Sequence, residues 1–376
     1  MHSTSGKIDD YGDSMFDAAE TPSAIKRSGW LKAARILGRV ALFLISIFVF
    51  VFSLMVMKTG AGPLAPWIRS SLSVDSPASA LGFGWLSANL ALSGSPVAAT
   101  ALTFLDAEVL SVTETFAMIA GSRLGAAMLV LLVGWIYVLR GKQRDLSLNV
   151  GLLSLLVTQT IYPPVLALGF LILSNGWLHS WQVTATHEAQ SPFQLFFDPV
   201  INGLHNILPA WAMLPLGFFL VLFSLWLFDK TIPGIHLKES GAGMVQHLLY
   251  RPVVTFIIGA VITIITMSVS VSLGLLVPLS IRGYVRRENL IPYILGANIT
   301  TFIDTLIAAA LLSNPTAVTV VLIQMVSVGI VSLVILVTSY RFYQHFVERV
   351  AELIGRSHKN LVAYVTLIIV IPFLLV

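Results

Sequence analysis

Long apolar runs, separated by short polar stretches, dominate the pattern of this sequence. Two of the runs, 81–105 and 253–279, contain clustered serines and glycines. Because the runs are continuous rather than alternating, they predict membrane helices and not the strands of a β-barrel. Seven others reach the ~20 residues that a helix needs to cross a bilayer. These seven cover residues 36–57, 113–139, 148–174, 207–228, 289–312, 316–339 and 360–376.

Composition supports the same interpretation. The 376 residues are 56% hydrophobic and 11% charged, with a mean hydropathy of +0.88. Soluble domains carry roughly a quarter charged residues, so we predict an all-α polytopic membrane protein embedded in a lipid bilayer. The chain has no cysteine, which excludes disulfides, thiolate metal sites and cysteine nucleophiles. The pI near 9.3 reflects basic anchoring loops, and nucleic acid is not an expected partner.

The basic residues favour one of two topologies. If 81–105 and 253–279 both crossed the membrane, the basic loop 140–144 would lie outside. If both are re-entrant hairpins, all but three of the 22 Lys and Arg are cytoplasmic, as the positive-inside rule requires. About 27 residues also make two half-helices of roughly 18 Å each. We therefore predict about seven transmembrane helices, two re-entrant hairpins and a cytoplasmic N-terminus, in the plasma or inner membrane. The three exceptions are Lys58, Arg69 and the intramembrane Arg123.

This topology divides the chain into five parts. Residues 1–35 are polar and mixed in charge, which predicts a disordered cytoplasmic tail. Residues 36–174 and 207–339 each contain a span, a hairpin and two further spans, with opposite starting sides. Such inverted repeats are common in secondary transporters. Residues 175–206, which lack Lys and Arg, form the predicted external loop between them. Residues 340–376 are a predicted cytoplasmic linker followed by the last transmembrane helix.

A shift of 175 positions aligns the two repeats without a gap. Gly84 meets Gly259, and the Ser93–Ser95 segment meets Ser268–Ser270. Arg123 then meets Asn298, each within a segment of small and polar residues. Apolar helices do not need Ser, Asn and Thr at this density, whereas a path for a polar solute does.

The aligned segments resemble motifs of the type II sodium-dependent phosphate cotransporter family. That family carries two inverted copies of a Gln-Ser-Ser-Ser hairpin, each followed by a Gly-Ala/Ser-Asn-Ile-Gly-Thr-Thr helix. The resemblance covers about residues 80–135 and 250–330. It implies that phosphate and sodium bind at the membrane centre during alternating access. The second copy here reads Met267-Ser268-Val269-Ser270 and Gly296-Ala297-Asn298-Ile299-Thr300-Thr301, and the first reads Leu92-Ser93-Gly94-Ser95 and Gly121-Ser122-Arg123-Leu124-Gly125-Ala126.

This chain departs from the family at several motif positions. Leu92 and Met267 replace the two glutamines, and Arg123 replaces the asparagine of the first copy. The threonine pair of the first copy is also absent. These are positions where the resemblance places ion and phosphate ligands.

The candidate site residues fall into two groups. Serine hydroxyls and the N-termini of half-helices can bind anion oxygens, although small residues also allow close helix packing. Neutral oxygens suit a hard cation, although they also form interhelical hydrogen bonds. The candidate substrate ligands are Ser93, Gly94, Ser95, Ser122, Arg123, Ser268, Ser270, Ser272 and Asn298, and the candidate sodium ligands are Asn298, Thr300, Thr301 and Asp304.

Arg123 and Asp304 each lie near the middle of a predicted span, where a charge is costly and indicates function. Three interpretations of Arg123 stay open. In the first, Arg123 binds the substrate anion through two parallel hydrogen bonds. In the second, its charge replaces a coupling cation, and in the third it forms a buried ion pair with Asp304. Proton coupling through Asp304 is a further alternative.

The sequence thus predicts a sodium–phosphate symporter. Two alternatives are a transporter of another oxyanion or organic anion without sodium coupling, and a transport-inactive membrane scaffold. No metal ligand set, nucleophile–base arrangement or nucleotide loop is evident, so we do not expect an enzyme. No cofactor is expected beyond sodium as the coupling ion, and a homodimer is compatible with this class of protein.

Overall fold

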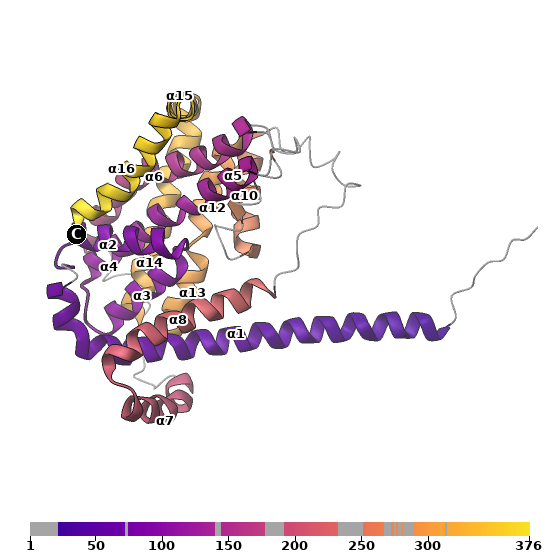
Figure 1. Ribbon diagram of the computed structural model, residues 1–376, viewed down its shortest axis with the longest axis vertical. Helices are drawn as coiled ribbons and strands as arrows, with labels where there is room; N and C mark the ends of the chain where they lie inside the picture. Colours follow the sequence, from indigo (N-terminus) through magenta and orange to yellow (C-terminus); the bar gives the residue numbers. More distant parts are fainter. Residues whose placement is uncertain are drawn as a thin grey trace, which may run out of the picture.

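A computed structural model describes residues 22–71, 74–139, 144–176, 192–231, 251–266, 272–273, 276, 280, 289–312 and 314–376. These residues are almost entirely helical, and none of them forms a strand (Figure 1). Within these ranges, seven helical segments are long and apolar enough to cross a membrane, and each overlaps one predicted span. They are Leu37–Arg69, Val112–Ile136, Leu148–Ser174, Ala210–Phe228, Leu290–Leu311, Pro315–Gly355 and His358–Leu375.

Three of these segments, Val112–Ile136, Leu290–Leu311 and Pro315–Gly355, contain more than one helix. In chain order the helices are α1 (Pro22–Ser71), α2 (Pro77–Ala91), α3 (Ser95–Asp106), α4 (Val112–Ala126), α5 (Met128–Leu139), α6 (Arg144–Ser174), α7 (Pro192–Ile207), α8 (Ala210–Asp229), α10 (Pro252–Thr266), α12 (Leu290–Thr300), α13 (Ile303–Leu311), α14 (Pro315–Val334), the π-helical turn η3 (Ile335–Ser339), α15 (Tyr340–Gly355) and α16 (His358–Leu375).

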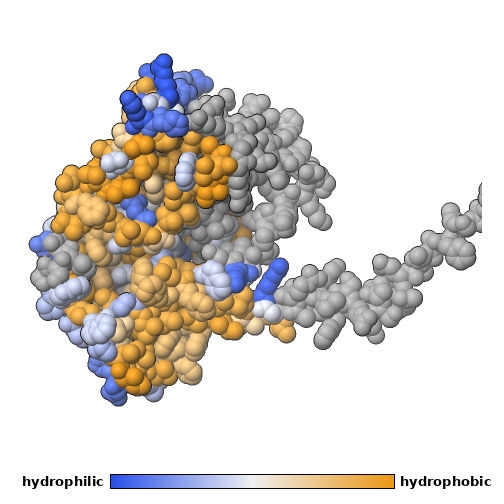
Figure 2. Space-filling model, viewed as in Figure 1, coloured by the Kyte–Doolittle hydropathy of each residue, from blue (hydrophilic) through white to orange (hydrophobic). Residues whose placement is uncertain are grey.

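The outer surface is apolar across most of the molecule. Figure 2 shows a broad area of hydrophobic side chains on this face, with a large hydrophilic group at its upper end and smaller ones elsewhere. Large side chains such as Phe219, Ile257 and Val337 are exposed on it. Exposed apolar surface of this extent fits a multi-pass membrane protein, whose helices face lipid.

The first helix extends beyond its predicted span at both ends. It begins at Pro22, so residues 22–35 are helical rather than disordered, and it continues to Ser71 through Pro63 and Pro66. By themselves, the Gly, Pro and Ser residues of this last part predict a loop. Ala61 and Ile68 are fully buried there, and such tertiary packing overrides the helix-breaking tendency of the sequence.

Two further helices lie in segments predicted as a loop and a linker. Helix α7 occupies the second half of the predicted external loop 175–206, and it buries Phe197 in a small cluster with Val51 of α1. Helix α15 continues α14 through η3, and its buried Val347 and Ala351 join the main core. Both segments are helical because an apolar face finds a neighbour to pack against.

The 175-residue shift also relates the bounds and the close contacts of several helices. Helix α10 has the bounds of α2 moved by this shift. A Cβ at Gly84 would lie 2.3 Å from the carbonyl oxygen of Met118, and one at Gly259 would lie 2.2 Å from that of Tyr293. Both residue pairs obey the shift. The same holds for the starts of α5 at Met128 and α13 at Ile303, each of which follows a break in a long helix.

Contacts along the helices give their directions. Helices α1 and α8 are antiparallel, since Gly60 approaches Leu214 while Met57 approaches Gly217. Helices α2 and α4 run parallel, since Gly121 approaches Leu81 and Gly125 approaches Trp85. The chain must therefore turn back and then turn again between α2 and α4, and α3 lies in that interval.

Candidate functional site

Asp304 lies at a break between two helices. Helix α12 ends at Thr300 and α13 begins at Ile303, so Asp304 occupies the first turn of α13, where a helix N-terminus favours negative charge. The Thr305 N–H donates to Asp304 Oδ1 at 2.5 Å, and the Thr305 hydroxyl donates to the same oxygen at 2.9 Å. The side chain is 9% exposed, so these donors stabilise a largely buried carboxylate.

Arg123 reaches the same break from α4. Its side chain is 4% exposed, and its NH2 group lies 3.5 Å from Asp304 Oδ1. Its NH1 group donates to Thr301 Oγ1 at 3.1 Å, and its NH2 group donates to Thr305 Oγ1 at 2.5 Å. The guanidinium carbon also lies 4.7 Å from the centre of the Phe302 ring, a cation–π arrangement. The buried ion pair that we considered from the sequence is therefore present.

The turn between α2 and α3 brings a third element to this point. Helix α2 ends at Ala91, the next residue Leu92 has a left-handed φ of 50°, and α3 begins at Ser95. The Ser95 hydroxyl donates to Asp304 Oδ2. A Cβ on Gly94 would lie 2.8 Å from the carbonyl oxygen of Ser122, so only glycine allows this close approach to α4. The turn thus contacts α4 and α13 together.

The structure brings together four of the predicted site residues: Ser95, Arg123, Thr301 and Asp304. Gly94 packs beside them, as described above, and Ser93 next to it is half-buried. Asn298 lies one helical turn before the break, where its amide donates to Thr158 Oγ1 of α6 at 3.4 Å.

Three predicted site residues have other partners. The Ser122 hydroxyl donates to the carbonyl of Ile119 in its own helix, and that of Thr300 donates to the carbonyl of Ala260 in α10. The Ser272 hydroxyl bonds to Thr263 and Tyr293. These contacts favour the alternative of close helix packing. Ser268 and Ser270 lie outside the described residues.

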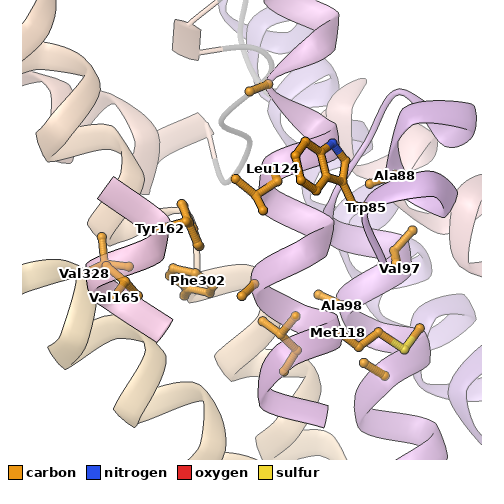
Figure 3. Packing of buried hydrophobic residues seen from close by; sticks show 14 of the residues in the cluster. Trp85, Ala88, Val97, Ala98, Met118, Leu124, Tyr162, Val165, Phe302 and Val328 are labelled. Carbon is orange, nitrogen blue, oxygen red and sulfur yellow. The ribbon is translucent and has the colours of Figure 1, made fainter. Parts of the chain in front are cut away.

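Sequence reasoning missed four residues of this region. Thr305 binds both members of the ion pair, Phe302 lies against the guanidinium, and Thr158 binds Asn298. Tyr162 of α6 lies beside Phe302 (Figure 3). Its buried hydroxyl and Arg123 Nε have no hydrogen-bond partner among the described residues. Thr305 could have been found, because it directly follows an intramembrane aspartate.

One cavity adjoins the ion pair, and a larger one is lined by residues of α1, α3 and α7. The first has a volume of about 100 Å³, and its mostly apolar lining includes the polar residues Ser46, Ser95, Ser224, Asp304 and Thr305. The other has a volume of about 440 Å³ and is lined by Lys58 and Asp106, among others. Leu311 belongs to the lining of both.

A second ion pair lies at the larger cavity. Lys58 Nζ is 2.7 Å from Asp106 Oδ2, and the Asn314 amide donates to Asp106 Oδ1 at 2.9 Å. Asn314 also caps the start of α14 through Thr316 and Ala317. This cluster joins α1, the end of α3 and the start of α14.

Among the described residues, no group of three or more His, Asp or Glu side chains could hold a metal ion. Comparison with known proteins identifies no matching family model, no matching curated protein and no matching solved structure. The resemblance to the phosphate cotransporters therefore stays a prediction from the motif residues. The assignment of function relies on the geometry of the site.

Proposed function

We propose that this protein is a secondary active transporter that moves an inorganic anion, phosphate first, by alternating access. The observation that carries this proposal is the buried Arg123, which lies where the α2–α3 turn meets the break between α12 and α13. In membrane proteins, irregular backbone and ionisable groups at depth line paths for polar solutes. The combination of a helix break, a turn and a buried arginine supports a solute site.

The proposed architecture has two inverted repeats, each with a re-entrant hairpin. Three observations support it. The bounds of α2 and α10 agree after the 175-residue shift, and Gly84 and Gly259 make close contacts with residues related by the same shift. Helices α1 and α8 also pack antiparallel. The parallel course of α2 and α4 supports a hairpin made of α2 and α3. The distribution of Lys and Arg supports a cytoplasmic N-terminus in a plasma or inner membrane.

The chemistry of the site favours an oxyanion. A guanidinium presents planar pairs of donors that match phosphate oxygens, and Arg123 Nε is a buried donor without a partner among the described residues. The N-termini of α3 and α13 both lie beside Asp304, and helix N-termini attract anions. In this proposal, the anion replaces Asp304 as the partner of Arg123.

Arg123 already contacts two of the expected ligands of sodium, the coupling ion that the resemblance implies. The Thr301 hydroxyl and the Asp304 carboxylate both contact Arg123. This arrangement supports the interpretation that the charge of Arg123 replaces a coupling cation.

Uptake of labelled phosphate into proteoliposomes tests the proposal. We expect saturable uptake by the full chain and at least a tenfold loss in Arg123→Lys, because an ammonium cannot reproduce the bidentate geometry. Failure of the wild type to move phosphate under any ion gradient would contradict phosphate transport. A panel of sulfate, arsenate and carboxylates then tests other anions.

A transport-inactive scaffold is the second candidate. It is favoured by the fact that the NH1 and NH2 groups of Arg123 already have partners in the protein. It predicts an absence of flux for every anion of the panel.

A further inference from the structure

We propose that Asp304 is the coupling group of the transporter: it takes up a proton when an anion binds Arg123, so that the anion and the proton cross together. This inference rests on the proposed anion transport and names the ion that drives it. It follows from the charges in the site, the partners of the carboxylate and the lining of the adjacent cavity.

The charge balance of the site requires a compensating cation. Arg123 and Asp304 are both largely buried and contact each other, so their charges cancel in the absence of substrate. Arginine cannot lose its proton in a protein. An anion that replaces Asp304 at Arg123 would therefore leave two negative charges beside one positive charge in a low-dielectric region. A proton on Asp304 restores neutrality, and a neutral acid is less costly to bury than an unpaired carboxylate.

The partners of Asp304 can accommodate either protonation state. Oδ2 accepts from the Ser95 hydroxyl, and Oδ1 accepts from the Thr305 hydroxyl. A hydroxyl can rotate to accept a hydrogen bond as well as donate one. A protonated Asp304 can therefore donate to Ser95 or Thr305 without a change of rotamer in the neighbouring helices.

Arg123 is the charged partner that the structure gives Asp304. Ser46 of α1 and Ser224 of α8 also line the cavity beside the carboxylate, and their hydroxyls donate to backbone carbonyls of their own helices. The rest of the lining, apart from Ser95 and Thr305, is apolar. Helix α14, which packs on α13, has no Asp, Glu, Lys, Arg or His. On the other neighbouring helices, Asp106 of α3 pairs with Lys58 of α1, and Tyr293 of α12 binds Ser272. Glu114 of α4 accepts from the N–H of Ser111, and Arg69 of α1 donates to the carbonyl of Val109. Tyr162 of α6 lies beside Phe302, and its hydroxyl has no hydrogen-bond partner among the described residues.

A proton suits this environment better than sodium does. A hard cation takes several oxygen ligands, but the Thr301 and Thr305 hydroxyls already accept from Arg123. The cavity at Asp304 is otherwise largely apolar. A proton needs a single lone pair of the carboxylate, and it leaves a neutral acid that tolerates apolar surroundings.

The proposed step conserves charge and atoms. Dihydrogen phosphate accepts N–H donors of Arg123 as Asp304 withdraws, and a proton from water adds to a carboxylate oxygen of Asp304. On the opposite side of the membrane the new O–H bond breaks and the proton returns to water. Asp304 then pairs with Arg123 again as the anion leaves. No oxidation or reduction is involved.

Sodium-free proteoliposomes containing the full chain test this step. With an inside-alkaline pH gradient, wild type should accumulate dihydrogen phosphate about tenfold for each pH unit, the limit for one proton per anion. A membrane potential set with potassium and valinomycin should leave this uptake unchanged, because the loaded and empty sites are both neutral. Uptake that accelerates at an inside-positive potential would show that the anion crosses without a proton, which overturns the proposal.

The variant Asp304→Asn provides a second test of proton coupling. We expect it to lower accumulation to less than a third of wild type and to make the remaining flux respond to membrane potential. Glu348→Gln, which removes a carboxylate on α15 far along the chain from the site, is the matched control and should behave as wild type. If Asp304→Asn accumulates phosphate as wild type does, the proposal is overturned. If this variant does not fold, the response of wild-type uptake to membrane potential decides.

The two proposals fail in different ways. If wild type shows neither flux nor exchange of labelled for unlabelled phosphate, anion transport itself is wrong for phosphate. If it transports phosphate only with a sodium gradient and is indifferent to pH, transport stands and proton coupling is overturned.

Discussion

Arg123 shows how this molecule compensates a charge that is expensive to bury. Moving a guanidinium out of water costs several kcal/mol even after the protein relaxes. Asp304 supplies the opposite charge, Thr301 and Thr305 supply hydroxyl acceptors, and Phe302 presents a ring face. These partners all lie within residues 301–305, and Arg123 comes from α4. The arginine therefore connects the two halves of the chain.

Removing one charge of this pair should cost more than removing both. We expect Arg123→Gln to reduce stability by about 3–5 kcal/mol, because Asp304 is left buried without its cation. Adding Asp304→Asn should recover at least half of that loss, since no unpaired charge remains. Unfolding in detergent, followed for the two single variants and the double variant, measures the coupling. A double variant no more stable than Arg123→Gln would show that the ion pair does not stabilise the fold.

The sequence predicted part of this site because intramembrane charges are rare and conspicuous. Arg123 and Asp304 were predicted as an ion pair among three alternatives, and the structure shows that pair. Ser122 and Thr300 were predicted as ligands, but their hydroxyls bond to backbone carbonyls. The direction in which a small hydroxyl points depends on local backbone carbonyls and on helix crossing, and a motif does not specify either one.

At the scale of helices, close glycine contacts set the packing of the α2–α4 and α10–α12 pairs. A Cβ at Gly296 would lie 2.0 Å from the carbonyl oxygen of Phe256, a distance that no side chain can tolerate without a backbone shift. Small residues that allow helices to approach closely are a main source of stability in membrane bundles. Gly84 and Gly259 act in the same way.

Gly296→Ala should therefore destabilise the protein, by about 1–3 kcal/mol or more, as overpacking does. Gly329→Ala is the matched control, because nothing lies within 4 Å of its Cβ position in α14. That substitution should be neutral or stabilising by up to about 1 kcal/mol, since alanine favours a helix interior. Thermal unfolding of both variants in the same detergent makes the comparison. Equal melting temperatures would contradict the role assigned to Gly296.

Element boundaries were harder to predict than element number. All seven predicted spans correspond to helical segments of suitable length and hydropathy among the described residues. The ends of α1 and the whole of α7 were predicted as tail and loop, because Pro, Gly and polar residues favour those states locally. Burial of Ile68 and Phe197 depends on neighbours that are distant in sequence. Periodicity detects the spans, whereas tertiary contacts decide how far each helix continues.

At the scale of the whole molecule, the proposed inverted repeat requires the two hairpins to open toward opposite sides of the membrane. Each hairpin would reach the centre from its own side, and the Ser95–Asp304 contact would lie near the middle. A solute bound at Arg123 could then be exposed to one side or the other by movement of one repeat against the other. This arrangement is specific enough to test by labelling.

The absence of cysteine from the chain allows single cysteines to report membrane sidedness without background. Asp75, Glu108 and Arg251 are exposed positions at the start of α2, the end of α3 and the start of α10. If α2 and α3 form a re-entrant hairpin, Asp75→Cys and Glu108→Cys should both react with a membrane-impermeant maleimide from outside intact cells. Arg251→Cys should react only after the cells are opened, because the second hairpin would enter from the cytoplasmic side. Labelling of Asp75→Cys and Glu108→Cys from opposite sides would mean that α2 and α3 together cross the membrane, and the inverted repeat would then have to be abandoned.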